Sequence, residues 1–154
     1  MKNKFMSRAI ELSIENIHKG GGPFGSVIVK DNKIISEGFN KVTTTNDPTA
    51  HGEIVAIRNA CKILKNFDLN GCDLYTSCEP CPMCLSSIYW ARIDNVYYAN
   101  TRNDAKKIDF DDSLIYEELT KSTKERKIPM NQIMRDEAMK AFEIWDKKTD
   151  KVKY

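Results

Sequence analysis

The sequence predicts an α/β fold, a three-layer α/β/α sandwich around a mixed central sheet. Apolar residues at helical spacing open the chain, a hairpin pattern follows, and a strand, a helix and a strand succeed one another in the middle. A hairpin pairs its strands antiparallel, whereas a strand–helix–strand unit pairs them parallel through a right-handed crossover. The two pairings together predict a mixed sheet with helices on both faces.

The bulk composition predicts one globular domain over residues 1–154. With 154 residues, of which 41% are hydrophobic, the chain can bury a core of its own, and no repeat or linker divides it. Its 24 basic and 22 acidic residues nearly balance, so charge gives no indication of nucleic-acid or membrane affinity. No apolar run has the length of a membrane span. Five cysteines, an odd count, without a signal sequence favour the reducing cytoplasm.

The first predicted elements are a helix and a hairpin. The helix runs from Lys4 to His18, after which three glycines and a proline stop it. Residues 26–29 and 34–35 are β-formers on either side of the polar pair Asp31-Asn32, which predicts a two-residue turn. The apolar stripe expected to face the core of the helix consists of Phe5, Ala9, Ile10, Ile14 and Ile17.

Helices and strands alternate through the middle of the chain. Asp47 followed by Pro48 is typical of an N-cap and a first helical residue, so a helix is predicted to begin near Pro48. Its apolar stripe is Ile54, Ile57, Cys61 and Leu64. The later predicted elements are strands at 72–76 and 95–99, helices at 85–90, 113–119 and 135–147, and an ambiguous stretch at 128–134.

Three residues form a predicted metal site. His51 opens one helix, while Cys81 and Cys84 open another, three residues apart and therefore on a shared face. Thiolates and imidazole in a tetrahedral arrangement suit zinc, whereas magnesium and calcium prefer oxygen ligands. The partial positive charge at a helix N-terminus favours ionised sulfurs. We therefore predict one Zn²⁺ bound by His51, Cys81 and Cys84.

Glu53 is the predicted general acid/base. It follows His51 by two residues, and side chains at that separation point to nearly opposite sides of a helix, which makes Glu53 a poor ligand. A carboxylate close to the ion could instead accept a proton from water that the ion activates. The alternative is a closed structural site in which Cys78 joins His51, Cys81 and Cys84, leaving no place for water and no function for Glu53.

The pattern H-x-E followed by P-C-x-x-C resembles the signature of the zinc-dependent cytidine and nucleobase deaminase superfamily. Within that superfamily the chain resembles the bacterial guanine deaminases over nearly its full length. Gly52 is a departure, because relatives commonly carry alanine there. The stretches that carry the resemblance are GGPFGSVIVK at 21–30, VTTTNDPTAH at 42–51, TSCEPCPMC at 76–84, IYWAR at 88–92 and FDDS at 110–113.

This resemblance implies a cytidine-deaminase-like fold, one Zn²⁺ per subunit and hydrolysis of guanine to xanthine and ammonia. It also implies that Asn40 hydrogen-bonds a purine base, that Phe24 stacks near its ring and that Asp112 accepts from its amino and ring N–H groups. Tyr154 would close the active site, often that of a partner whose C-terminal segment is exchanged. A homodimer is therefore expected.

Alternatives remain open on the residues alone. Asn40 could be a loop cap, Phe24 a core aromatic, and either Asp111 or Asp112 the residue that recognises the base, the other being a helix N-cap. The enzyme could act on cytosine, guanosine or another aminated base, or on adenosine in tRNA. The balanced charge and the Tyr154 tail argue against nucleic acid. A structural zinc-binding module is the alternative from another class.

Overall fold

The computed structural model describes residues 2–154, and the chain separates into two compact units, Met1–Asp112 and Ser113–Tyr154. The prediction of a single domain with an exchanged C-terminal segment stays a prediction. The first unit contains α1 (Lys2–His18), β1 (Gly25–Lys30), β2 (Lys33–Phe39), α2 (Val42–Thr45), α3 (Gly52–Leu64), β3 (Cys72–Cys78), α4 (Pro82–Trp90), β4 (Asn95–Asn100) and α5 (Arg102–Lys106). The second contains α6 (Ser113–Thr120) and α7 (Arg135–Lys147), close to the predicted bounds, and residues 128–134 form no helix or strand.

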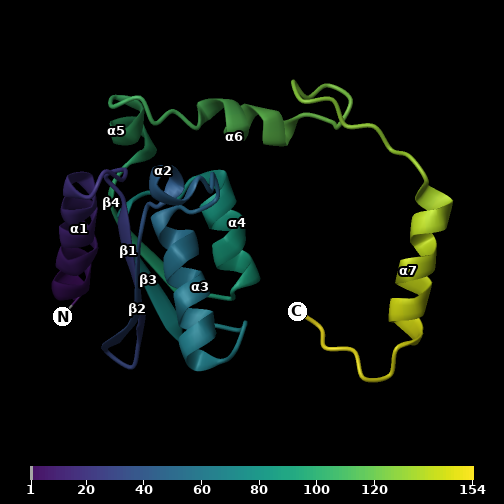
Figure 1. The fold of residues 1–154 in the computed structure, drawn as a ribbon, viewed down its shortest axis with the longest axis horizontal. Helices are drawn as coiled ribbons and strands as arrows, with labels where there is room; N and C mark the ends of the chain where they lie inside the picture. The colour runs from purple at the N-terminus through teal and green to yellow at the C-terminus, as the bar shows by residue number, and fades with distance from the viewer. Residues whose placement is uncertain (1) are drawn as a thin grey trace. The chain divides into compact units, whose positions relative to one another are not determined.

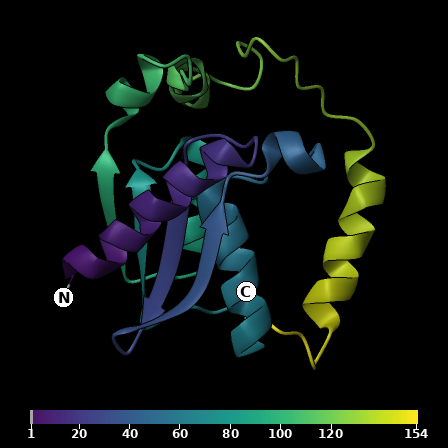
Figure 2. The ribbon, with the colours of Figure 1, turned by 60° about the vertical axis from the view of Figure 1, so that its left-hand side comes forward.

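The first unit is built on a mixed sheet with the strand order β2-β1-β3-β4. β1 pairs antiparallel with β2 and with β3, whereas β3 and β4 pair parallel across α4. Helix α1 covers one face of the sheet, and α3 and α4 cover the other (Figure 1). Figure 2 shows α1 crossing the strands of its face obliquely. The predicted three-layer sandwich with a mixed sheet is confirmed.

Alternation along the strands gives this unit two hydrophobic cores. Val27 and Val29 of β1 pack with α1, whereas Ile28 between them packs on the other face with α3 and α4. This is the period of two that sends successive side chains to opposite faces of a sheet. The predicted hairpin is also confirmed: Asp31 and Asn32 have φ values of 49° and 58°, as a type I′ turn requires.

The predicted first helix is confirmed, but its buried face agrees with the predicted one only at Phe5 and Ala9. Ile10, Ile14 and Ile17 are between 38% and 53% exposed. The buried positions include a leucine and two polar residues that the apolar pattern passed over, because one helical face here mixes both kinds of residue. That face consists of Phe5, Ala9, Leu12, Ser13 and Asn16.

The prediction that a helix begins near Pro48 is wrong, since α3 begins at Gly52. The Asp47 carboxylate accepts hydrogen bonds from the backbone N–H of Thr49 at 2.8 Å and from its hydroxyl at 2.7 Å. These bonds make a turn of the kind that asparagine and aspartate favour, and they compete with helix formation. His51 is consequently left in extended backbone before the helix. None of the described helices combines the length and apolar composition of a membrane span.

Candidate functional site

The candidate site is assembled where two helices of the first unit begin. His51 is the N-cap of α3, with extended backbone at φ −68° and ψ 157°. Cys81 is the N-cap of α4, also extended, and Pro82 follows it at the first helical position. Proline there fixes a φ suited to the helix and lacks an N–H that would have no intrahelical partner. Both helix starts therefore direct their unpaired N–H groups, and the partial positive charge of those groups, toward the same region.

The three predicted metal ligands lie together. The Nδ1 atom of His51 is 3.5 Å from the Sγ of Cys81 and 3.5 Å from the Sγ of Cys84. Ligand atoms of the three residues all lie within 4.8 Å of one another. Zinc bonds of about 2.3 Å to sulfur and about 2.0 Å to nitrogen, at a tetrahedral angle, would separate S and N by roughly 3.5 Å. The spacing and the donor chemistry fit Zn²⁺, with one tetrahedral position left open.

The two thiols of the site differ in pKa in the absence of a metal. The hydrogen bond from Cys84 lowers the pKa of Cys81 to about 4, and His51 acts in the same direction. The same bond and burial raise the pKa of Cys84, which keeps its proton. The bond to Cys81 also raises the pKa of His51. A divalent cation requires deprotonated sulfurs and neutral imidazole, so its binding would expel protons from this cluster.

Glu53 reaches the same cluster from the first turn of α3. Its side chain is buried, and the Cys84 thiol donates to its Oε2 at 3.5 Å. Burial is the main cause that raises the pKa of this carboxyl, followed in the same direction by the nearby Cys81. From helical spacing, the side chains of His51 and Glu53 were expected to point to opposite sides of one helix. That argument does not apply, because His51 lies outside the helix. A buried carboxyl of raised pKa beside a metal site is suited to exchanging protons.

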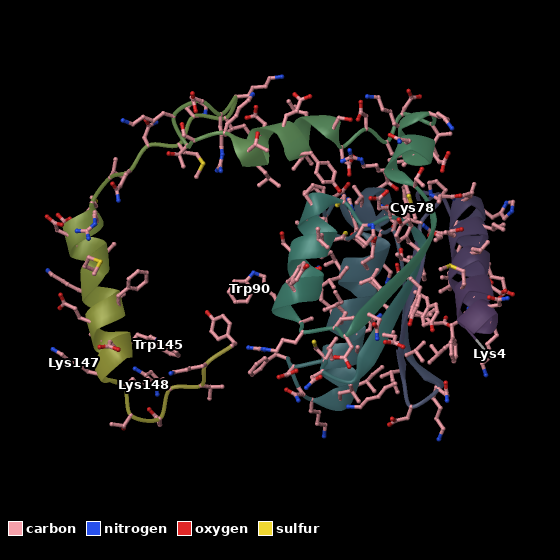
Figure 3. The ribbon with its side chains drawn as sticks, turned by 180° about the vertical axis from the view of Figure 1, so that it is seen from behind. Lys4, Cys78, Trp90, Trp145, Lys147 and Lys148 are labelled. Atoms are coloured by element: carbon pink, nitrogen blue, oxygen red, sulfur yellow. The ribbon has the colours of Figure 1, made fainter. Side chains whose placement is uncertain are left out.

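Cys78 does not join the metal-ligand group. It is the last residue of β3 (Figure 3), it is buried, and its thiol donates to the carbonyl oxygen of Thr101 at 3.7 Å. Burial raises its pKa to about 11, which favours the neutral thiol over a metal-binding thiolate. Among the described residues, the group placed to hold an ion consists of His51, Cys81 and Cys84. This arrangement disfavours the closed site with four protein ligands.

Asn40 is buried directly after β2, and its side-chain amide makes one structural hydrogen bond through its oxygen. Its Oδ1 accepts from the backbone N–H of Val42 at 3.2 Å, which is the loop-capping contact considered from the sequence. No acceptor for its Nδ2 lies among the described side chains and backbone groups. The capping bond fixes the amide and leaves this N–H₂ group available to a ligand.

Phe24 lies beside Phe110, an aromatic residue that the sequence analysis did not single out. The two rings meet edge to face, with centroids 4.9 Å apart and planes at 90°. Both rings are only partly shielded from solvent. The carbonyl of Phe24 adjoins Gly52, at the start of the helix that carries Glu53. The only signal for Phe110 in the sequence was its place in the FDDS stretch beside the candidate acidic residues.

The two neighbouring aspartates have different surroundings. Asp111 is exposed, and its carboxylate pairs with the Lys106 ammonium at 3.1 Å. Asp112 is half-buried, and burial is the main cause that raises its pKa. The charge of Cys81 also raises the pKa of Asp112, while Arg102 lowers it. Asp112 is thus the less solvated of the two aspartates.

Tyr154 belongs to the second unit, whereas the other candidate residues belong to the first. Its side chain is 73% exposed. The predicted closing role of Tyr154 stays a prediction.

Comparison with known families matches the amino-terminal two thirds of the chain to one model. Residues 1–100 match the cytidine and deoxycytidylate deaminase zinc-binding region. That span contains His51, Glu53, Cys81 and Cys84.

Two relatives differ in how much of the chain they resemble. The guanine deaminase of Bacillus subtilis (strain 168) is 53% identical over 151 residues, which are 97% of each chain. The tRNA-specific adenosine deaminase of Aquifex aeolicus (strain VF5) is 40% identical over 98 residues, which are 64% of this chain and 65% of that one. The likeness to the first therefore extends through the carboxyl-terminal unit.

Solved structures also differ in how much of this chain they cover. The X-ray structure of the Bacillus subtilis guanine deaminase superposes with a TM-score of 0.96 at 52% identity and covers 99% of this chain and 98% of that one. A structure solved in complex with 2,6-diaminopurine superposes with a TM-score of 0.66 at 32% identity, covering 70% of this chain and 61% of that one.

Proposed function

Because this chain belongs to the cytidine and deoxycytidylate deaminase zinc-binding family, we propose that it is a guanine deaminase, a zinc-dependent hydrolase that converts guanine to xanthine and ammonia. One observation carries the proposal. A His, Cys, Cys cluster with an open fourth position and a buried carboxyl beside it occurs in a chain that is 53% identical to a guanine deaminase over 97% of its length.

In the proposed reaction the metal centre activates water and Glu53 transfers protons. Zn²⁺ held by His51, Cys81 and Cys84 would lower the pKa of water and polarise it for attack. Glu53 takes a proton from the attacking water as a C–O bond forms at C2 of guanine, and passes it to ring nitrogen N3. Glu53 then moves the second proton of the water to the amino group, which leaves as ammonia when the C2–N bond breaks. Water and guanine are thereby consumed in equal amounts.

Three further residues bind the base in this proposal. Asn40 donates from its Nδ2 to a purine acceptor, since that group has no described acceptor and the Oδ1 is held by Val42. Phe24, supported edge-on by Phe110, packs against the ring. Asp112 accepts from the amino and ring N–H groups of guanine, and its position near Cys81 supports this assignment over Asp111. A base enclosed by these residues is shielded from competing water.

The functional unit in this proposal is a cytoplasmic homodimer in which Tyr154 closes the site of the partner subunit. Its support is the carboxyl-terminal unit, in which no residue is buried. Phe142 and Ile144 on α7 are 71% and 72% exposed. An isolated helix of this length is marginal in water, so α7 needs a surface to cover its apolar residues. A second copy of the chain supplies one.

The test is ammonia release by the purified, zinc-loaded protein from guanine, guanosine, adenine, cytosine and an anticodon stem-loop RNA. Turnover of guanine is expected, together with loss of at least about 10² in kcat in the Glu53→Gln variant with zinc still bound. Turnover of the RNA alone would replace guanine by a tRNA adenosine substrate. Absence of turnover on every substrate would instead indicate a structural zinc module, and a Glu53→Gln variant as active as the unmodified protein would remove Glu53 from the chemistry.

A further inference from the structure

Asn16 is a buried polar residue in the last turn of α1, outside the group of residues assigned to the reaction. Only 2% of it is exposed, and it shares a helix face with Phe5, Ala9 and Leu12. Burying an amide among apolar side chains is unfavourable unless its polar atoms find partners. The partners of this amide therefore indicate what the residue does.

The Asn16 side chain bridges the two segments that carry Asn40 and Phe24. Its Nδ2 donates one hydrogen bond to the carbonyl of Gly22 and another to the carbonyl of Asn40, each 2.8 Å long. Gly22 precedes Phe24 by two residues in the glycine-rich loop after α1. A single buried amide thus ties this loop to the end of β2.

Two backbone hydrogen bonds complete a ring with those of Asn16. The Phe24 N–H donates to the carbonyl of Gly22 at 2.9 Å, and the Asn40 N–H donates to the carbonyl of Phe24 at 3.0 Å. The ring therefore consists of the Asn16 side-chain amide and the backbone groups of Gly22, Phe24 and Asn40. Because the ring is closed, a shift at Asn16 changes the relative position of Phe24 and Asn40.

The glycine-rich loop is shaped to fit this amide. The Asn16 carbonyl accepts from the backbone N–H groups of Lys19 and Gly21, each at 3.0 Å, which ends α1 with Gly20 in the left-handed region at φ 83°. A Cβ on Gly21 would collide with the Asn16 side chain. Gly21 is therefore required by the packing of the asparagine rather than by its own backbone conformation.

We propose that Asn16 is a positioning residue for base binding, which holds Asn40 and Phe24 at the separation that a purine requires. This inference rests on the proposed function. Asn16 acts through those two residues and does not contact the base, so its removal should weaken binding of the base and spare the proton transfers of Glu53.

The first test measures hydrogen exchange and needs no substrate. Asn16→Asp keeps the shape of the side chain but turns an oxygen toward two carbonyls in place of the donor, and Asn16→Ser is a milder second variant. Exchange of the Phe24 and Asn40 amides should become at least about tenfold faster, because the ring loses two hydrogen bonds. Ser13→Ala is the matched control on the same helix face, since the Ser13 hydroxyl donates only to its own helix at the Ile10 carbonyl.

The second test separates binding from chemistry. In either Asn16 variant the KM for guanine should rise about tenfold, with kcat within about threefold of the unmodified enzyme and zinc retained. Added to Asn40→Ala, the Asn16 change should raise KM by a clearly smaller factor than it does alone, because part of its effect acts through Asn40. If the factors by which the two changes raise KM multiply in the double variant, or if amide exchange equals that of Ser13→Ala, Asn16 serves helix packing alone.

Absence of guanine turnover in the unmodified enzyme would refute the proposed function, and the exchange experiment would still decide the role of Asn16.

Discussion

Asp111 and Asp112 are identical in chemistry and adjacent in the chain, yet only one has the surroundings of a base-binding residue. The carboxylate of Asp111 is committed to Lys106 at 3.1 Å on the surface. Asp112 is half-buried, and its pKa is raised by burial and by the Cys81 charge. A partly desolvated carboxylate gains more from accepting N–H groups than an exposed one, because water competes less for it.

Asp112→Asn is therefore expected to lower kcat/KM for guanine by about 10- to 100-fold, the effect of losing a hydrogen bond to a charged acceptor. Asp111→Asn is the matched control and should change kcat/KM by less than about threefold, since an exposed ion pair contributes about 1 kcal/mol or less. Steady-state kinetics on both variants, with zinc content measured in parallel, checks the prediction. The reverse order of effects would assign base recognition to Asp111.

The sequence predicted that His51, Cys81 and Cys84 would lie together because each stands in a short motif at a helix start. Cys81 and Cys84 are fixed by one helix start, and His51 immediately precedes another. The bonds between Asn16 and the carbonyls of Gly22 and Asn40 could not be predicted in the same way. They join segments separated by a loop and a hairpin, and an asparagine in an apolar face has no periodic signal.

At the scale of elements, Gly38 sets how closely β2 approaches α3. A Cβ at this position would collide with the carbonyl of Gly52 and the backbone N–H of Ala56, and would lie 2.9 Å from the Ala56 Cα. These are backbone atoms of α3, the helix that follows His51. The packing of one strand against one helix therefore helps to place His51 and Glu53. Gly52 itself is less constrained, since a Cβ there would meet the Ser26 hydroxyl at 3.3 Å and the Phe24 carbonyl at 3.4 Å.

Gly38→Ala is expected to destabilise the protein by about 2–3 kcal/mol, because the backbone of α3 must move to admit the methyl group. Gly52→Ala should change stability by less than about 1 kcal/mol, since the lower flexibility of alanine offsets a mildly tight contact. Urea unfolding of the two variants, with zinc content determined on the folded protein, measures both effects. Equal stability of the two variants would contradict this account of the contact between β2 and α3.

The same helix shows where sequence patterns mislead at the scale of elements. Asp47-Pro48 has the residue types of a helix start, but the Asp47 side chain bonds to Thr49 and forms a turn instead. On α1 the error has another origin: isoleucines were preferred to Leu12 and Asn16 because hydrophobicity alone defined the expected face.

At the scale of the whole molecule, the carboxyl-terminal unit is the part for which we propose a partner chain. The helices of Ser113–Tyr154 follow the predicted bounds, but none of its residues is buried. Trp145 lies near the end of α7, beside Lys147 and Lys148 (Figure 3), and is 43% exposed. Apolar side chains on a helix with no core of its own support the proposed exchange between protomers.

If Tyr154 closes the site of the partner subunit, two inactive variants should restore activity to each other. A chain with Glu53→Gln supplies a normal Tyr154, and a chain with Tyr154→Ala supplies a normal Glu53. Unfolding and refolding an equal mixture gives mixed dimers for half of the population, each with one site that has both residues, so about a quarter of normal guanine turnover should return. The matched control is the same mixture without unfolding, which should remain inactive while chains do not exchange. A Tyr154→Ala protein with normal activity would remove the closing role of this residue. An inactive refolded mixture in which mixed dimers are detected would instead place Tyr154 over the site of its own chain.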